Sequence, residues 1–242
     1  MSGVAGALDA VTSDIPLKEA VRYKKGNLKW TRSDVKKHTE ALACGLLELG
    51  CKATFPFPPP TPELHQPGDT VAVWLPECSE KHIAQLAAAR VGMVVAEVDP
   101  TLTSADAVGK VLEESGATVV LLEDKMISSL SEAVPELRHY STSSGLPFRS
   151  ARFPALRLCL HTGFDREPAL HNFRSVLLYQ PSPSPLTLVD GKVKGNLPLF
   201  TEYTAGKGGV PIKGATLSQN EVLETGKWET VGAILSKTYT EV

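Results

Sequence analysis

Three short apolar runs, separated by helical patterns, constrain the fold of this chain more than any other feature. The runs are Thr70–Leu75, Met93–Val98 and Thr118–Glu123. Apolar residues at helical spacing lie between them, over residues 77–91 and again over residues 104–116. Continuous apolar strands that alternate with helices are typical of parallel βαβ units, whose sheet is covered on both faces. The sequence therefore predicts an α/β fold with a parallel sheet.

Helix signals also mark the beginning of this domain. Thr31 and Asp34 have the spacing of a capping pair, in which two side chains accept hydrogen bonds from backbone N–H groups at the start of a helix. Apolar residues at helical spacing follow as far as Gly50, and glycine is typical of a helix end. We therefore expect residues 1–29 to be an N-terminal extension and residues 30–242 to form one α/β domain.

Two turn-rich segments interrupt the domain. Residues 54–67 read TFPFPPPTPELHQP, and this density of proline favours an extended or polyproline II backbone. The insert is either a solvated loop or a docking arm, because Phe55 and Phe57 place aromatic rings on a stiff backbone that loses little entropy on binding. Residues 180–196 form a second, turn-rich connector.

The composition excludes several classes of function. A net charge of −2 over 242 residues gives no reason to expect binding to nucleic acid or to an anionic membrane. No apolar run reaches the roughly 18 residues of a membrane span, so we expect no transmembrane segment. The four cysteines and six histidines lack the spacings of zinc sites, and we expect neither a bound metal nor a disulfide framework.

A glycine-rich stretch from Tyr203 to Ser218 carries the most specific chemical signal. It reads YTAGKGGVPIKGATLS. Glycine removes the Cβ atom and allows positive φ, so that backbone N–H groups can approach phosphate oxygens. A hydroxyl adds a donor, and a lysine adds a point charge. The candidate phosphate-binding residues are Thr204, Gly206, Lys207, Gly208, Gly209 and Lys213.

This stretch resembles the signature loop of the adenylate-forming (acyl-CoA synthetase) superfamily, YTSGTTGxPKGxxxSH, with three departures. Lys207 and Gly208 replace two hydroxyl residues, Ile212 is inserted between the proline and the lysine, and Gln219 stands where the family has histidine. The insertion displaces Lys213 by one residue relative to the turn, and a misplacement of about 1 Å can cost roughly a hundredfold in rate. The resemblance therefore implies a vestigial phosphate loop.

The resemblance covers nearly the whole chain, from about Ile15 onward. The stretches AQLAAARVGMVVAEVDP and YTAGKGGVPIKGATLSQNEVL are most similar to the medium-chain, mitochondrial branch of the family. Only the N-terminal portion of the family is matched, which implies parallel βαβ units as in the N-terminal subdomain of adenylate-forming enzymes, in truncated form. The family's adenine-binding residues, ribose-binding aspartate, magnesium-binding acid and catalytic lysine lie beyond the loop. The resemblance thus implies no catalytic residue and no cofactor in this chain.

These departures favour a function other than catalysis. The resemblance implies a pseudo-enzyme that serves as a structural or accessory subunit of a larger assembly, with a respiratory-chain complex as its setting. We expect its partners, other protein subunits, to contact exposed strand edges and the rings of Phe55 and Phe57. Two alternatives remain open. One is a regulatory module that binds a nucleotide or acyl-CoA, and the other is half of a split adenylate-forming enzyme.

The N-terminal residues carry little information about location. Asp9 and Asp14 lie in this segment, and no arginine precedes Arg22, which is atypical of a cleavable transit peptide. Mitochondrial import by an uncleaved or internal signal is the expectation that follows from the resemblance, with the cytoplasm as the alternative.

Overall fold

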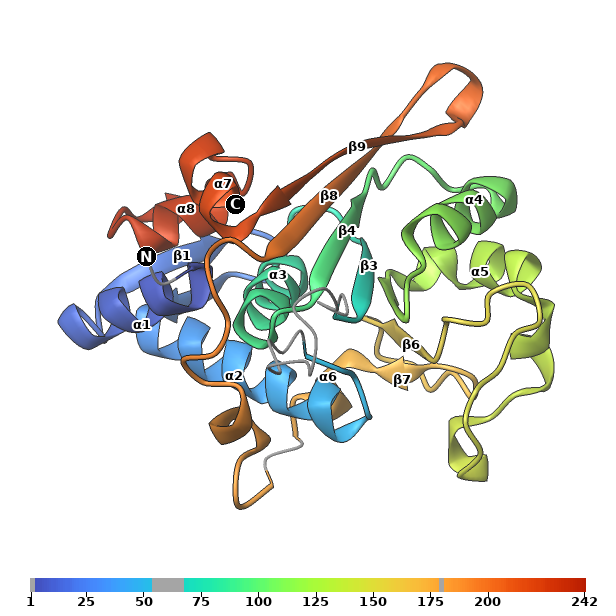
Figure 1. The fold of residues 1–242 in the computed structure, drawn as a ribbon, viewed down its shortest axis with the longest axis horizontal. Helices are drawn as coiled ribbons and strands as arrows, with labels where there is room; N and C mark the ends of the chain where they lie inside the picture. Colours follow the sequence, from blue (N-terminus) through green and yellow to red (C-terminus); the bar gives the residue numbers. More distant parts are fainter. Residues whose placement is uncertain (1–2, 54–67, 179–180) are drawn as a thin grey trace, which may run out of the picture.

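A computed structural model describes residues 3–53, 68–178 and 181–242. Its centre is a seven-stranded sheet in the order β7-β6-β5-β3-β4-β8-β9 (Figure 1). Neighbouring strands are parallel, apart from β9, which is antiparallel to β8. The strands are β3 (Thr70–Trp74), β4 (Val94–Val98), β5 (Val119–Leu122), β6 (Leu158–His161), β7 (His171–Asn172), β8 (Pro198–Ala205) and β9 (Pro211–Ser218). The predicted α/β fold with a parallel sheet is confirmed.

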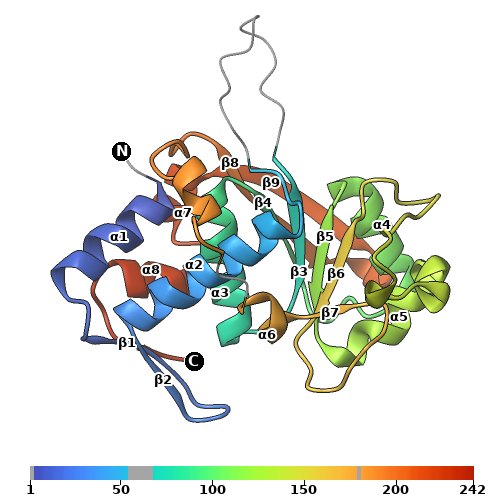
Figure 2. The ribbon, with the colours of Figure 1, turned by 90° about the horizontal axis from the view of Figure 1, so that it is seen from below.

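Helices cover both faces of this sheet (Figure 2). One layer contains α1 (Val4–Asp14), α2 (Arg32–Glu48), α3 (Ser79–Val91), α7 (Gln219–Thr225) and α8 (Glu229–Leu235), and the other contains α4 (Ala105–Ser115) and α5 (Ile127–Ala133). A short α6 (Phe173–Val176) follows β7, and 3-10 turns occupy Asp124–Met126, Pro135–His139, Thr142–Ser144, Pro185–Leu188 and Lys207–Gly209. None of the helices in the described part of the chain is long and apolar enough to cross a membrane.

A second, three-stranded sheet lies beside the first helical layer. It consists of β1 (Glu19–Tyr23), β2 (Leu28–Thr31) and β10 (Thr240–Glu241), in the order β10-β1-β2. β1 is antiparallel to β2 and parallel to β10, so the first and last parts of the described chain are joined by backbone hydrogen bonds.

Side-chain caps begin α2 and α4 at the residues that the sequence predicts. The hydroxyl of Thr31 accepts a hydrogen bond from the N–H of Asp34, and the Asp34 carboxylate accepts one from the N–H of Thr31 at 2.9 Å. The Ser104 hydroxyl caps α4 in the same way by accepting from the N–H of Ala107 at 3.2 Å. These bonds satisfy N–H groups that have no partner within the helix.

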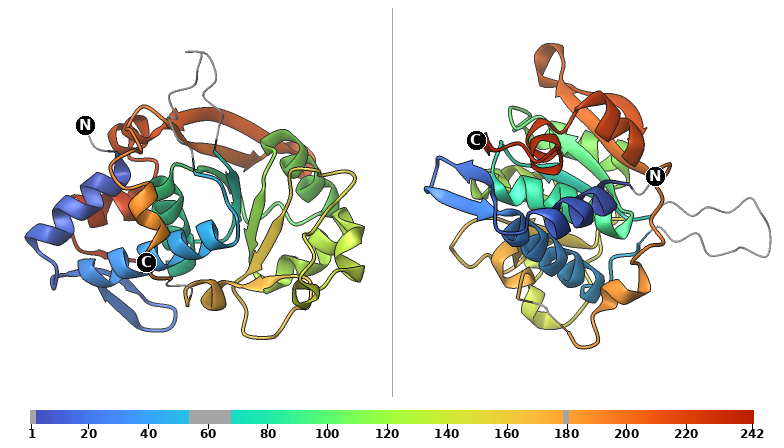
Figure 3. Two further views of the ribbon diagram at one scale, coloured as in Figure 1. Left: turned by 60° about the horizontal axis from the view of Figure 1, so that its bottom comes forward. Right: turned by 90° about the vertical axis from the view of Figure 1, so that its left-hand side faces the viewer.

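Residues 3–29 pack into the body of the domain (Figure 3). α1 contacts α2 and α3, and it buries Val4, Leu8 and Val11 in the same core as those helices. The expected extension thus shares its core with the residues that follow, and residue 30 does not separate two packed bodies.

Of the two turn-rich segments, the structure describes only the second. The proline-rich insert at residues 54–67, with Phe55 and Phe57, lies outside the described residues. The described part of the second connector, residues 181–196, contacts α2 and buries Leu186 and Val189.

Candidate functional site

The glycine-rich stretch forms the tip of the β8–β9 hairpin, which extends beyond the body of the domain (Figures 1 and 3). The tip begins where β8 ends, at Ala205, and this is the carboxyl end of a parallel strand. β4 ends beside it, where the backbone N–H of Asp99 donates to the carbonyl of Tyr203 at 2.9 Å. Ligands of open α/β sheets bind outside the carboxyl ends of the strands. The tip therefore lies where this fold class binds its ligands.

Asp99 adds a carboxylate beside the tip and is not among the predicted site residues. The N–H and the hydroxyl of Thr101 donate to Asp99 Oδ1 at 2.8 and 2.7 Å. These hydrogen bonds, with one from the N–H of Ala205, lower the pKa of Asp99 below its ordinary value. The signal that could have found this residue is an acidic side chain directly after a buried strand, at the edge where ligands bind.

Two glycines determine the conformation of the tip. Gly208 and Gly209 have φ angles of 73° and 74°, a region that other residues adopt only at a cost. The N–H of Gly206 donates to the carbonyl of Val210 at 2.8 Å, and the N–H of Gly209 donates to the carbonyl of Gly206 at 3.1 Å. The side chain of Lys207 is exposed. The tip is thus a tight turn in which backbone atoms and the side chain of Lys207 face solvent.

A β-bulge absorbs the inserted Ile212. Ala205 pairs with Pro211 and Thr201 pairs with Thr216, so five residues of β8 face six residues of β9. The surplus lies between these two pairs, at the step where two residues of β9 face one residue of β8. Without Ile212 the two strands would have equal numbers of residues between the same two pairs.

The bulge determines which face of the hairpin carries Lys213. Lys213 pairs with Tyr203, and directly opposite residues of an antiparallel pair share a face. Tyr203 is buried with the side chains of α4, and Lys213 Nζ donates to the carbonyl of Glu114 at 3.1 Å. Glu114 is in the last turn of α4, where a cation is favourable. Thr204, the next residue of β8, is exposed and points to the opposite face.

The hairpin thus separates the predicted site residues into two groups. The exposed tip brings together Thr204, Gly206, Lys207, Gly208 and Gly209, whereas Lys213 is directed to α4. For metals, the described residues contain no group of three or more His, Cys, Asp or Glu side chains placed to hold an ion.

Gln219 follows β9 directly and has no exposed surface. Its Oε1 accepts a hydrogen bond from the N–H of Val4 at 2.9 Å, and its Nε2 donates to the carbonyl of Ala89 at 2.9 Å. A Cβ atom on Gly3 would lie 2.0 Å from Gln219 Oε1, so the start of α1 fits closely over this amide. The residue at the family's histidine position therefore joins α1 to α3 in this chain.

Solved structures of acyl-CoA ligases share this fold. A long-chain-fatty-acid CoA ligase from Rhodopseudomonas palustris superposes with a TM-score of 0.73 and 16% identity, over 99% of this chain and 56% of that one. The N-terminal domain of FACL13 from Mycobacterium tuberculosis gives a TM-score of 0.72 and 16% identity, over 100% and 57% of the two chains.

Sequence relatives belong to the same class. YngI of Bacillus subtilis, named as an acyl-CoA synthetase, is 23% identical over 230 residues, which are 92% of this chain and 38% of the relative. The mitochondrial medium-chain acyl-CoA ligase ACSF2 of Danio rerio is 25% identical over 229 residues, which are 92% of this chain and 34% of the relative. The chain thus spans little more than a third of these relatives, and it matches their N-terminal part.

These comparisons contradict the expectation of a non-catalytic structural subunit in a respiratory-chain assembly. The reported relatives and structural neighbours are acyl-CoA synthetases and ligases, which are enzymes. The expectation was wrong because departures from the family pattern within one loop do not by themselves indicate a new function. That partner subunits contact the strand edges, of which β9 is one, stays a prediction.

The resemblance stated from the loop and the βαβ stretch is confirmed. The family model described as AMP-binding enzyme matches residues 63–236, which is more than half of the chain. This chain belongs to the AMP-binding enzyme family.

Proposed function

We propose that this chain supplies the N-terminal part of an acyl-CoA ligase, and that the tip of its β8–β9 hairpin binds the phosphates of ATP. The observation that carries the proposal is the position of the tip. It joins a turn with two left-handed glycines and an exposed lysine, Lys207, to the carboxyl end of β8. A turn of this kind directs backbone N–H groups toward an anion, and lysine adds positive charge.

The complete reaction requires more than the described residues. In the relatives, the matched part is 38% and 34% of the whole protein. Activation of a carboxylate by ATP also needs groups that position the acyl substrate and stabilise the developing charge. We therefore expect the 242-residue chain alone to bind MgATP without forming acyl adenylate, and to contribute to adenylate formation when the remaining part of such a ligase is supplied.

Deletion of Ile212 tests the phosphate-binding role. With Ile212 removed, the lysine moves from opposite Tyr203 to opposite Thr204 and thus changes to the face of the hairpin that is turned away from α4. A hydrogen bond from an ammonium group to a phosphate contributes about 1.5–3 kcal/mol, so MgATP affinity is expected to rise about tenfold or more. Isothermal titration calorimetry of the wild-type chain and the deletion variant measures this difference.

Two controls make this experiment specific. Ile212→Ala keeps the strand length and the bulge, and its affinity is expected to equal that of the wild-type chain. Lys213→Met combined with the deletion is expected to lose the gain. If the deletion variant binds MgATP no more tightly than the wild-type chain, the hairpin tip does not bind the phosphates as proposed.

We include a mitochondrial location in the proposal. It is supported by the relative from Danio rerio, whose name places it in the mitochondrion. Fractionation of cells that express the full chain, with detection of the protein in each fraction, tests this location. Recovery of the protein in the cytosolic fraction alone would contradict it.

A further inference from the structure

Two of the departures from the family pattern concern lysines of the β8–β9 hairpin. The inserted Ile212 displaces Lys213, whose Nζ donates to the carbonyl of Glu114 on α4 at 3.1 Å. Lys207 replaces a hydroxyl residue and lies at the tip itself, with its side chain exposed. One departure thus takes a cation away from the tip, and the other places a cation there.

Lys213 is directed away from the tip by its position in the strand. It pairs with Tyr203, which has no exposed surface and packs with the side chains of α4. Glu114, its acceptor, is in the last turn of α4, where a cation is favourable. To reach a ligand at the tip, Lys213 would have to leave this carbonyl and change to the other face of the hairpin.

Lys207 has a backbone conformation that suits an anion. The residue is helical, and Gly208 after it is left-handed, with φ 73° and ψ 17°. A right-handed residue followed by a left-handed one directs successive N–H groups to the same side, where they form a concavity for anions. The ammonium group of Lys207 is joined to this turn by a flexible four-carbon stem. Backbone donors and a positive charge therefore come from the same turn.

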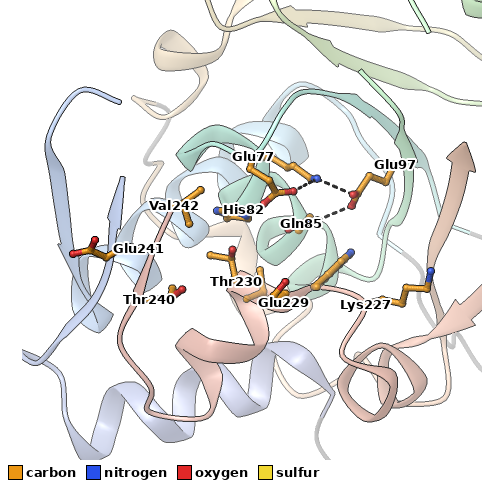
Figure 4. A pocket seen from close by; sticks show the side chains of 13 residues that line it. Glu77, His82, Gln85, Glu97, Lys227, Glu229, Thr230, Thr240, Glu241 and Val242 are labelled. Atoms are coloured by element: carbon orange, nitrogen blue, oxygen red, sulfur yellow. Dashed lines mark hydrogen bonds and ion pairs between the residues drawn. The ribbon is translucent and has the colours of Figure 1, made fainter. Parts of the chain in front are cut away.

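Two other lysines near β4 and β8 already have carboxylate partners. Lys81 pairs with Glu97 at 2.7 Å in the wall of the pocket shown in Figure 4. Lys227, in the same wall, pairs with Glu202 at 2.8 Å. An ion pair would have to break before either lysine could contact a phosphate. Within the described residues Lys207 has no acidic partner, so it needs no such exchange.

We propose that Lys207 has taken over the phosphate contact that the insertion of Ile212 withdrew from Lys213. This inference rests on the proposed function of the tip. It makes Lys207 the residue that supplies positive charge to the phosphates, and Lys213 a residue that fixes the hairpin to α4. The two departures then compensate for each other.

Four chains test this exchange by calorimetric titration with MgATP: the wild-type chain, Lys207→Met, the deletion of Ile212, and both changes combined. Lys207→Met is expected to weaken binding about tenfold, the effect of one hydrogen bond to a charged group. Deletion of Ile212 moves Lys213 to the face turned away from α4, so the combined variant is expected to recover the affinity of the wild-type chain.

Three further variants make the assignment specific. Lys213→Met, in a chain that retains Ile212, is expected to leave MgATP affinity unchanged. Lys25→Met removes an exposed charge from the turn between β1 and β2, and as the control for net charge it is expected to bind like the wild-type chain. Lys207→Arg retains the charge and is expected to bind within about threefold of the wild-type chain.

Three outcomes would overturn this inference alone. They are wild-type affinity in Lys207→Met, a loss in Lys213→Met equal to that in Lys207→Met, and no recovery in the combined variant. Absence of MgATP binding by both the wild-type chain and the deletion variant would instead overturn the proposed function of the tip. If the deletion variant does not fold, the two single lysine variants still decide.

Discussion

Replacement of Gln219 by leucine is expected to lower the free energy of unfolding by about 3 kcal/mol or more. Leucine has a similar volume but leaves two buried groups, the N–H of Val4 and the carbonyl of Ala89, without their partner. Each such loss costs about 1–3 kcal/mol. Because the two bonds join α1 to α3, the variant should also loosen the first helix.

Urea unfolding, followed by circular dichroism, measures the change in stability. Amide hydrogen exchange at Val4 reports on the first helix, and its rate is expected to rise in the variant. Glu224→Ala, an exposed change on the same helix as Gln219, serves as the control and is expected to alter stability by less than about 0.5 kcal/mol. A loss below about 1 kcal/mol for Gln219→Leu would show that the two bonds are not formed as described.

Replacement of Arg90 by methionine is expected to cost about 1–3 kcal/mol at neutral pH, because a buried guanidinium loses its ion pairs while the carboxylates that remain are 34–51% exposed. The side chain of Arg90 is 6% exposed and connects three elements. Its guanidinium lies 3.1 Å from Asp9 on α1, 3.0 Å from Glu40 on α2 and 3.3 Å from Asp190 in the connector. Methionine retains most of the apolar contact but leaves three carboxylates close together.

The cost of Arg90→Met is also expected to depend on pH. Burial opposes ionisation of Asp9, but the hydrogen bond from Lys36 and the charge of Arg90 outweigh it and lower the pKa of Asp9 below 3.8. A carboxylate with a lowered pKa stabilises the fold above its unfolded pKa and loses this contribution as the pH falls through its folded pKa. The difference between the wild-type chain and Arg90→Met should therefore be full near neutral pH and shrink below about pH 4.

Urea unfolding of both proteins at a series of pH values measures this dependence. Arg90→Lys keeps the charge but has fewer donors in a less rigid arrangement, and its stability is expected to lie between the other two. A stability difference that stays constant down to about pH 3 would rule out the carboxylates as the cause.

Much of the fold was predictable because its signals are local. The apolar runs that predicted strands correspond to β3, β4 and β5, and the capping pair of Thr31 and Asp34 begins α2. α1 was overlooked as an element, although Val4, Leu8 and Val11 have helical spacing and all three are buried. Its neighbours are helices much further along the chain, so its place in the core was not evident from local pattern.

The site was only partly predictable because its geometry depends on distant residues. The family pattern marked Gln219 as a departure, but its partners lie 215 and 130 residues away in sequence. Ile212 was recognised as an insertion that displaces Lys213. That this displacement becomes a change of face depends on pairing with β8, which the sequence alone does not specify.

The bulge in β9 has a consequence for how such a loop can evolve. Extra length that enters the hairpin near its tip is taken up before Thr216, and a second register shift, between Pro198 and Phe200, lies beyond that point. Two register shifts therefore separate Gln219 from the tip. Variation in the length of the turn can thus be absorbed within the hairpin, so that selection can modify the turn at a smaller cost in stability than a change within the core would carry.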